Sequence, residues 1–591
     1  MVIQKILFPT ENVLKKELFF RGLEEDDAKN QDSISIDKNK KITSNTYFNS
    51  FSIGKWKKYS NISSLELCIE LQGEALIHIY GSKIQNGQVF TERITSMHTE
   101  NVKREYQIDI DLNCGYICVF FEIYAYAAKV IFYGGGYTTK TLSERDIKIG
   151  IDICTYNRYE YLKKNIDLLT KNIIDNPESL LYNKMEVFVV DNANDHKTLQ
   201  FQNKKIHVFL QNQKGSAGGF TRGMMEITQN KNFTHCVVMD DDVRLYPAVI
   251  ERLYLFLKYL KSEYNDALIG GSLMRLDMPH IQHEAGALWN DGGVSSCKGN
   301  YNMLDYRLVV ENEVEERTDY MGWWFCCIPI ETIEKSGYPL PVYFHRDDVE
   351  YGLRNTKQIT LNGICTWHKS FESKVSAVDE YYNVRNTGII LAIYQRKCYK
   401  YCYFVIKNIL ANLFLLKYNV VELMLQGVED FMKGAEWVIH NDNGDYYNAL
   451  KEKNFEERDA SILEKIEIDE NLLENKKKLD GKNKWIHNLL LNANFKKSHK
   501  VILVSSNCFD TSLFWNVGCA YYYNKYADKV FCCVKSRRIF WKSIGRMSKD
   551  MVCLLFRYTS LSSEWKWKKE EWIQKKFWGA FLETSYKNIK K

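Results

Sequence analysis

Proline is scarce in this chain, and the sequence lacks the common signals for secretion and membrane insertion. Only 7 of its 591 residues are proline, and no long tract of serine, glycine and proline occurs, which argues against extended disordered linkers. The N-terminal residues lack the apolar core and small-residue cleavage site of a signal peptide. No run of about eighteen uncharged apolar residues is present. The closest stretch, 401–416, is interrupted by Lys407 and two asparagines and therefore predicts a buried helix.

The cysteine pattern argues against a disulfide framework. None of the 16 cysteines belongs to a CxxC pair, and two doublets are adjacent in the sequence, Cys326–Cys327 and Cys532–Cys533. Because adjacent cysteines are awkward for such a framework, we expect reduced thiols in a cytoplasmic protein.

Charge and composition are those of an ordinary globular protein. Lys and Arg number 80 against 74 Asp and Glu, which leaves a net charge of only +6. No aromatic RNP pattern, zinc finger or basic helix is present, so no nucleic-acid partner is expected. Hydrophobic residues make up 45% and charged residues 26%, and a chain of this length exceeds one core, so roughly two to four domains are expected.

Residues 1–147 carry strand signals and few helical ones. Apolar and polar residues alternate with period two at 65–71, 75–80 and 106–112. Such runs, broken by Gly, Asn and Ser, predict an antiparallel, jelly-roll-like β-sandwich. Whether this domain binds sugars or acts as a scaffold stays open.

From residue 148 to 390 predicted strands and helices alternate. Apolar strands are expected at 149–154, 187–190, 206–210 and 236–239. This alternation predicts a mostly parallel, Rossmann-like sheet, whose ligands bind beyond the carboxyl ends of the strands. Polar clusters follow four of the predicted strand ends, at 155–158, 191–192, 211–219 and 240–242.

Three consecutive aspartates, Asp240, Asp241 and Asp242, follow the last of these strands. Adjacent like charges cost folding energy unless a cation neutralises them. Carboxylates at this edge of an α/β sheet suit a hard divalent metal that also carries a substrate's phosphates. A solvated acidic turn explains the triplet alone equally well. His368, which follows a later apolar run, is a further metal-ligand candidate.

The other clusters suit a nucleotide sugar. Asp191 can accept hydrogen bonds from a ribose or uracil edge, and the planar fork of Arg158 can meet a base or a phosphate. The glycine-rich turn 212–220 allows a ligand close to the backbone, and the helix N-terminus after it favours an anion or sugar hydroxyls. The turn lacks the Lys-Ser/Thr ending of a Walker A loop, which disfavours ATP hydrolysis.

Two later segments carry further candidate functional residues. Trp323 and Trp324 are either core residues or a platform on which a sugar ring stacks. Asp347, Asp348 and Glu350 open a predicted helix. Their like charges can raise one carboxyl pKa toward a value useful for catalysis.

Together these motifs resemble the family-2, GT-A-fold glycosyltransferases, and they are most similar to the mycobacterial-type galactofuranosyltransferases that polymerise galactan. The motifs run in the order T-Y-N-R, D-N, N-x-x-G-x-x-G-G-F, D-D-D, G-W-W-F, D-D-x-E and W-H. The likeness extends to 46–51, 218–224, 381–386 and 428–431. It implies an α/β multidomain protein with a β-sandwich at 1–147, a GT-A catalytic domain at 148–390 and a mainly helical domain at 391–591.

The resemblance also implies the reaction and its residues. The expected reaction is the inverting, metal-dependent transfer of galactofuranose from UDP-galactofuranose to a saccharide acceptor. The acceptor is expected to be lipid-linked, and the product to belong to a cell-surface glycan. Asp240, Asp242 and His368 would hold Mn²⁺ or Mg²⁺, and Asp348 would be the general base with Asp347 beside it. The UDP site would comprise Thr155, Asn157, Arg158, Asp191, Asn212, Gly218, Gly219 and Asp241, and the acceptor site Trp323, Trp324, His345 and Glu350.

Two alternatives stay open. The same fold could use another nucleotide-sugar donor, such as a rhamnose donor, or the protein could be a non-catalytic carbohydrate-binding protein. The C-terminal residues 537–578 mix basic residues with tryptophan, which fits either an anionic bilayer surface or packing on the protein body. The charged segment 452–500, including 476–478, predicts an exposed helical face or a mobile connection, and 501–505 predicts a strand. A homo-oligomer is left open.

Overall fold

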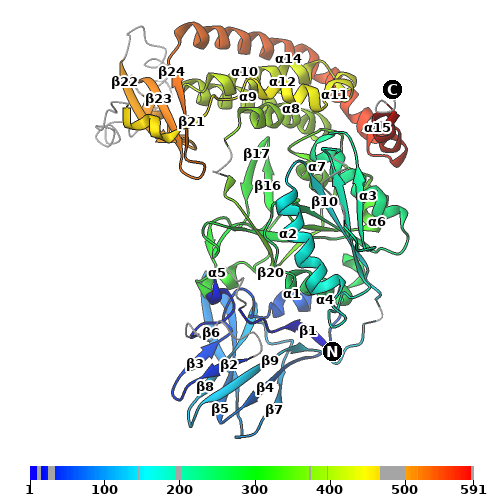
Figure 1. Cartoon of the computed structure of the whole chain (residues 1–591), viewed down its shortest axis with the longest axis vertical. Helices are drawn as coiled ribbons and strands as arrows, with labels where there is room; N and C mark the ends of the chain where they lie inside the picture. Colours follow the sequence, from blue (N-terminus) through cyan, green and yellow to red (C-terminus); the bar gives the residue numbers. More distant parts are fainter. Residues whose placement is uncertain are drawn as a thin grey trace.

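The protein is elongated, with a β-sandwich at one end, an α/β region in the middle and a helical region at the other end (Figure 1). This arrangement is seen in a computed structural model. The residues that it describes are 1–9, 15–23, 33–143, 145–194, 201–371, 375–395, 397–465, 499–514 and 517–587.

The N-terminal part is a sandwich of two antiparallel sheets, as predicted. One sheet has the order β1-β9-β4-β7 with β2 on β9, and the other has the order β3-β8-β5-β6. Alternate side chains such as Ile77 and Ile79 are buried between the sheets, which is the period-two pattern of the sequence. The strands are β1 (Val2–Lys5), β2 (Ile34–Ile36), β3 (Lys41–Thr43), β4 (Leu65–Gln72), β5 (Ala75–Gln85), β6 (Gln88–His98), β7 (Arg104–Ile110), β8 (Cys118–Ala125) and β9 (Val130–Thr138).

A short helix, α1 (Ile53–Tyr59), attaches the sandwich to the α/β region. The Trp56 ring is fully buried and meets Phe256 edge-to-face, with ring centroids 5.2 Å apart. Lys55 Nζ lies 3.0 Å from Glu313 Oε2, and both side chains are buried. This interface combines an aromatic contact with a buried ion pair.

The middle of the chain forms a nine-stranded sheet with the order β12-β11-β10-β13-β19-β14-β15-β18 and with β20 on β14. The pairs β10–β11, β10–β13, β11–β12 and β14–β20 are parallel. Because β19 is antiparallel to both β13 and β14, β14 and β20 point the same way as β13. The strands are β10 (Ile149–Thr155), β11 (Met185–Asp191), β12 (Ile206–Leu210), β13 (His235–Asp240), β14 (Leu268–Arg275), β15 (Ile281–Glu284), β18 (Tyr301–Asn302), β19 (Cys326–Pro329) and β20 (Gln358–His368).

The helices of this region cross between the parallel strands, and the predicted α/β architecture is confirmed. The four predicted strands correspond to β10, β11, β12 and β13. The sheet is mixed, since β15, β18 and β19 run antiparallel to their neighbours. A separate hairpin is formed by β16 (Ala287–Asn290) and β17 (Gly293–Ser296). The helices are α2 (Tyr159–Leu169), α3 (Gly215–Gln229), α4 (Ala248–Tyr259), α5 (Tyr306–Glu311), α6 (Ile330–Ser336) and α7 (Asp347–Arg354).

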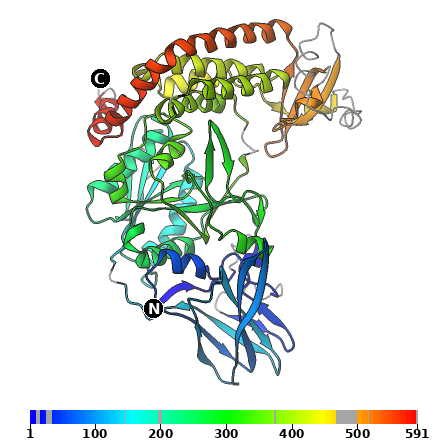
Figure 2. The same cartoon turned by 180° about the vertical axis from the view of Figure 1, so that it is seen from behind.

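The C-terminal helices pack around one apolar core, with the 36-residue α14 (Arg537–Trp572) along its outer side (Figures 1 and 2). The predicted buried helix is α9 (Cys398–Phe414). The predicted boundary at residue 390 lies within α8 (Ala377–Tyr394), and the three domain boundaries stay predictions. Among the described residues, no helix combines the length and apolar character needed to cross a bilayer. The other helices are α10 (Tyr418–Met432), α11 (Ala435–Asn441), α12 (Gly444–Lys451) and α15 (Lys575–Lys587).

Helix α15 returns to the α/β region, where it packs against α3. The Trp578 indole is fully buried, and its Nε1 donates to the Pro339 carbonyl at 2.9 Å. Lys214, beside the glycine-rich turn, places its Nζ 4.1 Å from the centre of the Phe581 ring. The end of the chain therefore completes the packing of the α/β region.

A four-stranded sheet in the C-terminal region was not predicted. Its order is β21-β24-β23-β22, and it lies at the far end of the helices (Figure 2). Only β22, which matches the strand expected at 501–505, carried a clear signal. Residues 466–498 of the charged segment, including 476–478, lie outside the described residues. The strands are β21 (Arg458–Asp459), β22 (Lys500–Ser505), β23 (Val517–Asn524) and β24 (Lys529–Val534).

Candidate active site

Neighbouring strand ends bring the predicted polar clusters to one edge of the sheet. The register of β10 and β11 pairs Thr155 with Asp191, and that of β10 and β13 pairs Cys154 with Asp240. Three clusters that are far apart in the sequence are therefore side by side. This is the edge at which open α/β sheets bind ligands.

Arg158 and Thr155 contact two members of the aspartate triplet, Asp241 and Asp242. Arg158 Nη1 lies 2.7 Å from Asp242 Oδ2 and 3.4 Å from Asp241 Oδ1, and Thr155 Oγ1 donates to Asp241 Oδ2 at 2.7 Å. Burial acts to lower the pKa of Arg158, but the carboxylates of Asp242, Asp241 and Asp240 raise it above its usual value. Burial raises the pKa of Asp241 to about 6 although Arg158 opposes this. With Asp241 only 4% exposed, the triplet is not a solvated acidic turn.

His368 reaches the triplet because the chain after Asp242 pairs with the end of β20. Arg244 N donates to the Trp367 carbonyl at 2.7 Å, and Trp367 N donates to the Arg244 carbonyl at 3.0 Å. His368 Nε2 consequently lies 3.2 Å from Asp242 Oδ1. Carboxylates are ligands that suit Mn²⁺ or Mg²⁺, and an imidazole is a common metal ligand. In the described part of the chain no group of three His, Cys, Asp or Glu is arranged to hold a metal ion, so this ligand set stays a prediction.

The predicted nucleotide-binding residues Asn157, Asp191 and Asn212, from the first three clusters, also lie at or after strand ends. Asp191 is fully buried and accepts hydrogen bonds from the Tyr159 hydroxyl at 3.3 Å and from Ala193 N at 2.9 Å. Asn157 has a left-handed backbone, with φ of 56°. Asn212 Oδ1 accepts from Asn194 Nδ2 at 3.4 Å.

The glycines of the α3 turn permit close packing of the helix on the sheet. A Cβ on Gly219 would lie 2.1 Å from Cys154 Sγ, and one on Gly218 would lie 2.4 Å from Lys214 Cβ. Protein atoms thus occupy the space on the Cβ side of these two glycines. Their role in nucleotide binding stays a prediction, whereas their role in packing follows from these contacts.

The second acidic cluster begins α7. Ser216 Oγ, in the glycine turn, donates to Asp347 Oδ2 at 2.8 Å, and Asp348 Oδ1 accepts from Val349 N at 2.7 Å. Burial and the adjacent Asp347 carboxylate raise the pKa of Asp348 to about 8. Burial also raises the pKa of Asp347. These shifts have the direction that adjacent like charges predict.

The two acidic clusters meet around Cys154. Burial raises the pKa of the Cys154 thiol, and Asp241 and Asp240 from one cluster and Asp347 from the other raise it further. The carboxylates of both acidic clusters therefore act on the same thiol.

The two tryptophans of the G-W-W-F motif have different environments. Trp323 is 5% exposed and meets Phe220 edge-to-face, with ring centroids 5.4 Å apart, in the apolar core. Trp324 is half-buried, and its ring centre lies 6.4 Å from that of Phe371, which in turn stacks on His368 at 5.4 Å. Of the two, only Trp324 is next to the site.

The other two predicted acceptor residues also differ. Glu350 is 1% exposed, is 2.9 Å from Arg354 Nη2 and accepts from the Tyr394 hydroxyl at 2.7 Å. These contacts support helix packing. His345, immediately before the α7 cluster, places Nε2 3.6 Å from Asp379 Oδ1 and lies at the site.

Two supporting side chains carried no sequence signal. Asn165 Nδ2 donates to the carbonyls of Asp241 at 3.1 Å and Val243 at 2.9 Å, which orients the turn after β13. Burial raises the pKa of Glu284, at the end of β15, to about 7, and its charge acts on Asp348. A single Asn in a helix or a single Glu in a short strand matches no motif.

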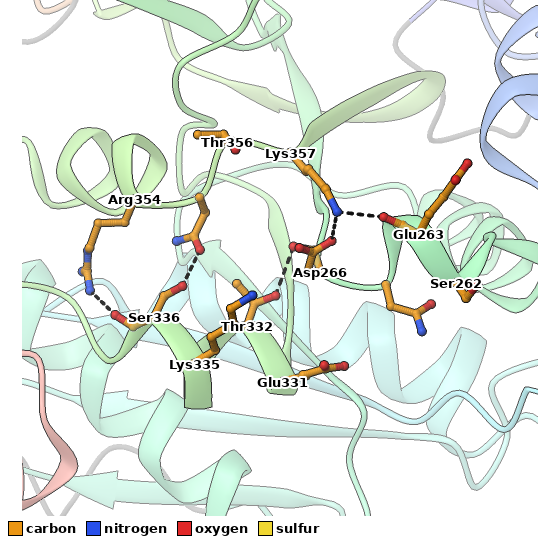
Figure 3. Close-up of a pocket in the computed structure, with 12 residues that line it drawn as sticks. Ser262, Glu263, Asp266, Glu331, Thr332, Lys335, Ser336, Arg354, Thr356 and Lys357 are labelled. Atoms are coloured by element: carbon orange, nitrogen blue, oxygen red, sulfur yellow. Dashed lines mark hydrogen bonds and ion pairs between the residues drawn. The ribbon is translucent and has the colours of Figure 1, made fainter.

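A polar cavity of about 430 Å³ lies at the opposite edge of the sheet (Figure 3). It is lined by residues just before β14 and β20, among them Asp266 and Lys357, whose Nζ lies 2.9 Å from Asp266 Oδ1. Arg354, at the end of α7, lines it too and donates to the Ser336 carbonyl at 2.6 Å. The cavity thus lies at the amino end of β20, whose carboxyl end carries His368 of the candidate site.

Two family profiles match the chain. The profile described as galactofuranosyltransferase 2 N-terminal matches residues 3–139, and the one described as glycosyl transferase family 2 matches residues 151–287. The chain is a glycosyltransferase with a family 2 domain at residues 151–287. The second match includes the aspartate triplet of this glycosyltransferase and ends before α7 and His368.

Two curated relatives confirm the resemblance inferred from the motifs. Both are named galactofuranosyltransferase GlfT2. The protein from Mycobacterium tuberculosis is 25% identical over 442 residues, which cover 70% of this glycosyltransferase and 68% of the relative. The protein from Mycolicibacterium smegmatis is 26% identical over 441 residues, covering 69% and 66%. A solved structure of xylanase 10B modules from Clostridium thermocellum aligns with 32% of the chain at 8% identity and a TM-score of 0.16, which is too low to bear on the fold.

Proposed function

We propose that this glycosyltransferase moves galactofuranose from UDP-galactofuranose to a saccharide acceptor, with inversion at the anomeric carbon. Support for the donor comes from the similarity of both the sandwich and the catalytic region to proteins named galactofuranosyltransferase. The observation that carries the reaction type is the position of Asp348. Its carboxyl begins α7, separate from the strand-end aspartates, and burial beside Asp347 raises its pKa to about 8.

The strand-end residues would bind the nucleotide. Thr155, Asn157 and Asp191 end or follow β10 and β11, where a ribose or uracil edge can hydrogen-bond to them. The Arg158 guanidinium, already beside two carboxylates, suits the diphosphate because its fork donates to two oxygens at once.

Asp240, Asp242 and His368 would hold Mn²⁺ or Mg²⁺. The two carboxylates fit such an ion, and the 3.2 Å approach of His368 Nε2 to Asp242 Oδ1 brings two of the three side chains together. A divalent cation at this position would supply Lewis acidity that stabilises the negative charge on the departing UDP.

Asp348 would act as the general base. One of its oxygens takes the proton of the acceptor hydroxyl while that hydroxyl oxygen attacks the anomeric carbon on the face opposite UDP. Base catalysis of this kind contributes about 10²–10⁴-fold to a rate. Ser216 fixes the neighbouring Asp347 at 2.8 Å, so the charge that raises the pKa of Asp348 stays in place.

A panel of donors tests this function. We expect UDP-galactofuranose to give faster UDP release with a galactofuranosyl acceptor than UDP-galactopyranose or UDP-glucose does, and faster turnover than dTDP-rhamnose. Faster turnover of dTDP-rhamnose would establish the alternative donor. Release from no donor, with or without an acceptor, would support the non-catalytic alternative, against which the presence of both acidic clusters and His368 argues.

We also propose that the outer face of α14 binds an anionic membrane, the place of a lipid-linked acceptor. The tryptophans of this region fall into a buried and an exposed group. The buried ones are Trp565, Trp572 and Trp578, which are 1%, 2% and 0% exposed. Large apolar side chains with 51–84% exposure lie at helical spacing on the opposite face of α14, and basic residues accompany them. The apolar residues are Trp541, Val552, Leu555, Phe556 and Trp567, and the basic ones are Arg538, Lys542 and Lys549.

Cosedimentation with vesicles tests the membrane face. A variant combining Leu555→Ser, Phe556→Ser and Trp567→Ser is expected to bind phosphatidylserine-containing vesicles at least about tenfold more weakly, since a buried apolar side chain contributes about 1.5–3 kcal/mol. Phe509→Ser is the matched control, because Phe509 is 79% exposed elsewhere on the chain. Equal binding of the triple variant and the wild type, or no binding of the wild type, would refute this proposal.

A further inference from the structure

The segment before α7 has an unusual backbone. In residues 342–346, here called the base loop, three non-glycine residues have left-handed φ angles: Tyr343 at 65°, His345 at 63° and Arg346 at 69°. Non-glycine residues seldom adopt this conformation, and it persists only where the surroundings hold it. The base loop leads directly into Asp347 and Asp348, so its conformation sets the direction of both carboxyls.

Two adjacent side chains of α8 hold the base loop by its carbonyl groups. Asn386 Nδ2 donates to the carbonyls of Phe344 and His345, both at 2.8 Å. Arg385 Nη2 donates to the Val342 carbonyl at 2.8 Å, and Arg385 Nε donates to Asn386 Oδ1 at 2.9 Å. Both side chains are 0% exposed, so water does not replace these bonds.

The helical region balances the buried charge of Arg385. Arg385 Nη2 lies 2.7 Å from Asp442 Oδ2, with both side chains buried. Burial acts to lower the pKa of Arg385, but Asp442, Tyr381 and Tyr382 together raise it above its usual value. The Tyr382 hydroxyl donates to Asp442 Oδ1 at 3.1 Å, and its ring stacks on Tyr343 in the base loop at 5.6 Å. Asp442, between α11 and α12, is thus connected to the base loop by two routes.

The remaining sides of α7 are fixed by other elements. A Cβ on Gly215 would lie 1.9 Å from the Tyr343 carbonyl oxygen, so the α3 turn is tightly packed against the base loop. At the other end of α7, Arg354 donates to the Ser336 carbonyl at 2.6 Å beside the polar cavity (Figure 3). The start of α7 therefore depends on the base loop for its orientation.

We propose that Arg385, Asn386 and Asp442 are positioning residues that hold the base loop so that the Asp348 carboxyl faces the acceptor hydroxyl. None of them needs to touch the substrate. The C-terminal helices thereby take part in catalysis through a buried ion pair. This inference rests on the proposed role of Asp348.

The test compares two buried aspartates of the helical region. Asp442→Asn keeps the shape of the side chain and removes the charge that holds Arg385. We expect kcat for UDP-galactofuranose to fall by about 10²-fold, the effect of a displacement near 1 Å, with the donor KM and the UDP Kd within about threefold of wild type.

Asp430→Asn is the matched control. Asp430 is 1% exposed, accepts from the Tyr381 hydroxyl at 2.9 Å and pairs with Lys433 at 2.7 Å, without an ion pair to Arg385. We expect its kcat to stay within about threefold of wild type, even where its melting temperature falls as far as that of Asp442→Asn. Equal kcat losses in the two variants, or wild-type kcat in Asp442→Asn, would overturn the inference.

A second variant covers failure of Asp442→Asn to fold. Asn386→Ser removes the donors to Phe344 and His345 and leaves the Arg385–Asp442 pair. The same fall in kcat with unchanged UDP affinity supports the inference, and an unchanged kcat overturns it. If the wild type itself transfers no sugar from UDP-galactofuranose, the proposed function fails. If the wild type transfers the sugar and the positioning variants keep the wild-type kcat, the inference fails and the proposed function stands.

Discussion

Asp348→Asn is expected to lower kcat for sugar transfer by about 10²–10⁴-fold, the range that general base catalysis supplies. Asparagine keeps the size of the side chain and cannot accept the proton of the acceptor hydroxyl. The UDP site is formed by other elements, so the UDP Kd measured by calorimetry should stay within about threefold of wild type. Sugar transfer by Asp348→Asn at the wild-type rate would show that Asp348 is not the general base.

The pH dependence provides an independent measurement of the same group. A base works in its carboxylate form, and burial beside Asp347 raises the pKa of Asp348 to about 8. Below that pH the active form shrinks, so kcat/KM of the wild type should rise with pH and level off above about 8. Asp347→Asn removes one charge that raises this pKa, and the rise should then occur at lower pH. Asp305→Asn, in a surface pair with Arg307, should leave the profile unchanged.

Asp242→Ala is expected to abolish the gain in UDP affinity that Mn²⁺ brings. Asp242 contacts both Arg158, at 2.7 Å, and His368, at 3.2 Å. Loss of a metal ligand weakens metal binding by at least about tenfold. The affinity for UDP without metal should not fall, because Arg158 loses a competing carboxylate and becomes available to the diphosphate.

Calorimetry of UDP binding with and without Mn²⁺ separates these effects. The matched control is Asp277→Ala, since Asp277 pairs with Arg275 at the same 2.7 Å distance beside the end of β14. That variant should keep the full gain from Mn²⁺. A full gain in Asp242→Ala as well would exclude Asp242 as a metal ligand.

The architecture and the strand-end clusters could be predicted because both depend on local pattern and strand direction. Period-two alternation identifies the sandwich strands, and βαβ alternation identifies the parallel sheet. Once the strands are parallel, Thr155, Asp191 and Asp240 must meet at one edge, whatever their separation in the sequence. The sequence alone therefore predicts that the polar clusters after β10, β11 and β13 lie side by side.

Contacts decided by packing could not be predicted in this way. Trp323 and Trp324 are adjacent and chemically identical, yet only the path of the chain sends the first into the core and leaves the second near His368. Glu350 belongs to an acidic motif but forms a buried ion pair with Arg354. Nothing around Asp442 marks it as the partner of Arg385, because the packing of α11 and α12 on α8 creates that pair. Strand β23 could not be predicted either, because its run of three tyrosines shows no clear alternation of apolar and polar residues.

The burial of Trp578 has a consequence for the order in which the protein is completed during synthesis. Its indole donates a hydrogen bond of 2.9 Å to the carbonyl of Pro339, which lies 239 positions earlier in the chain. Arg385 likewise pairs with a residue that is translated later, Asp442. The α/β region therefore leaves the ribosome before the side chains that finish its core exist. The α/β region can complete its packing only once the segments that carry Asp442 and Trp578 have been translated.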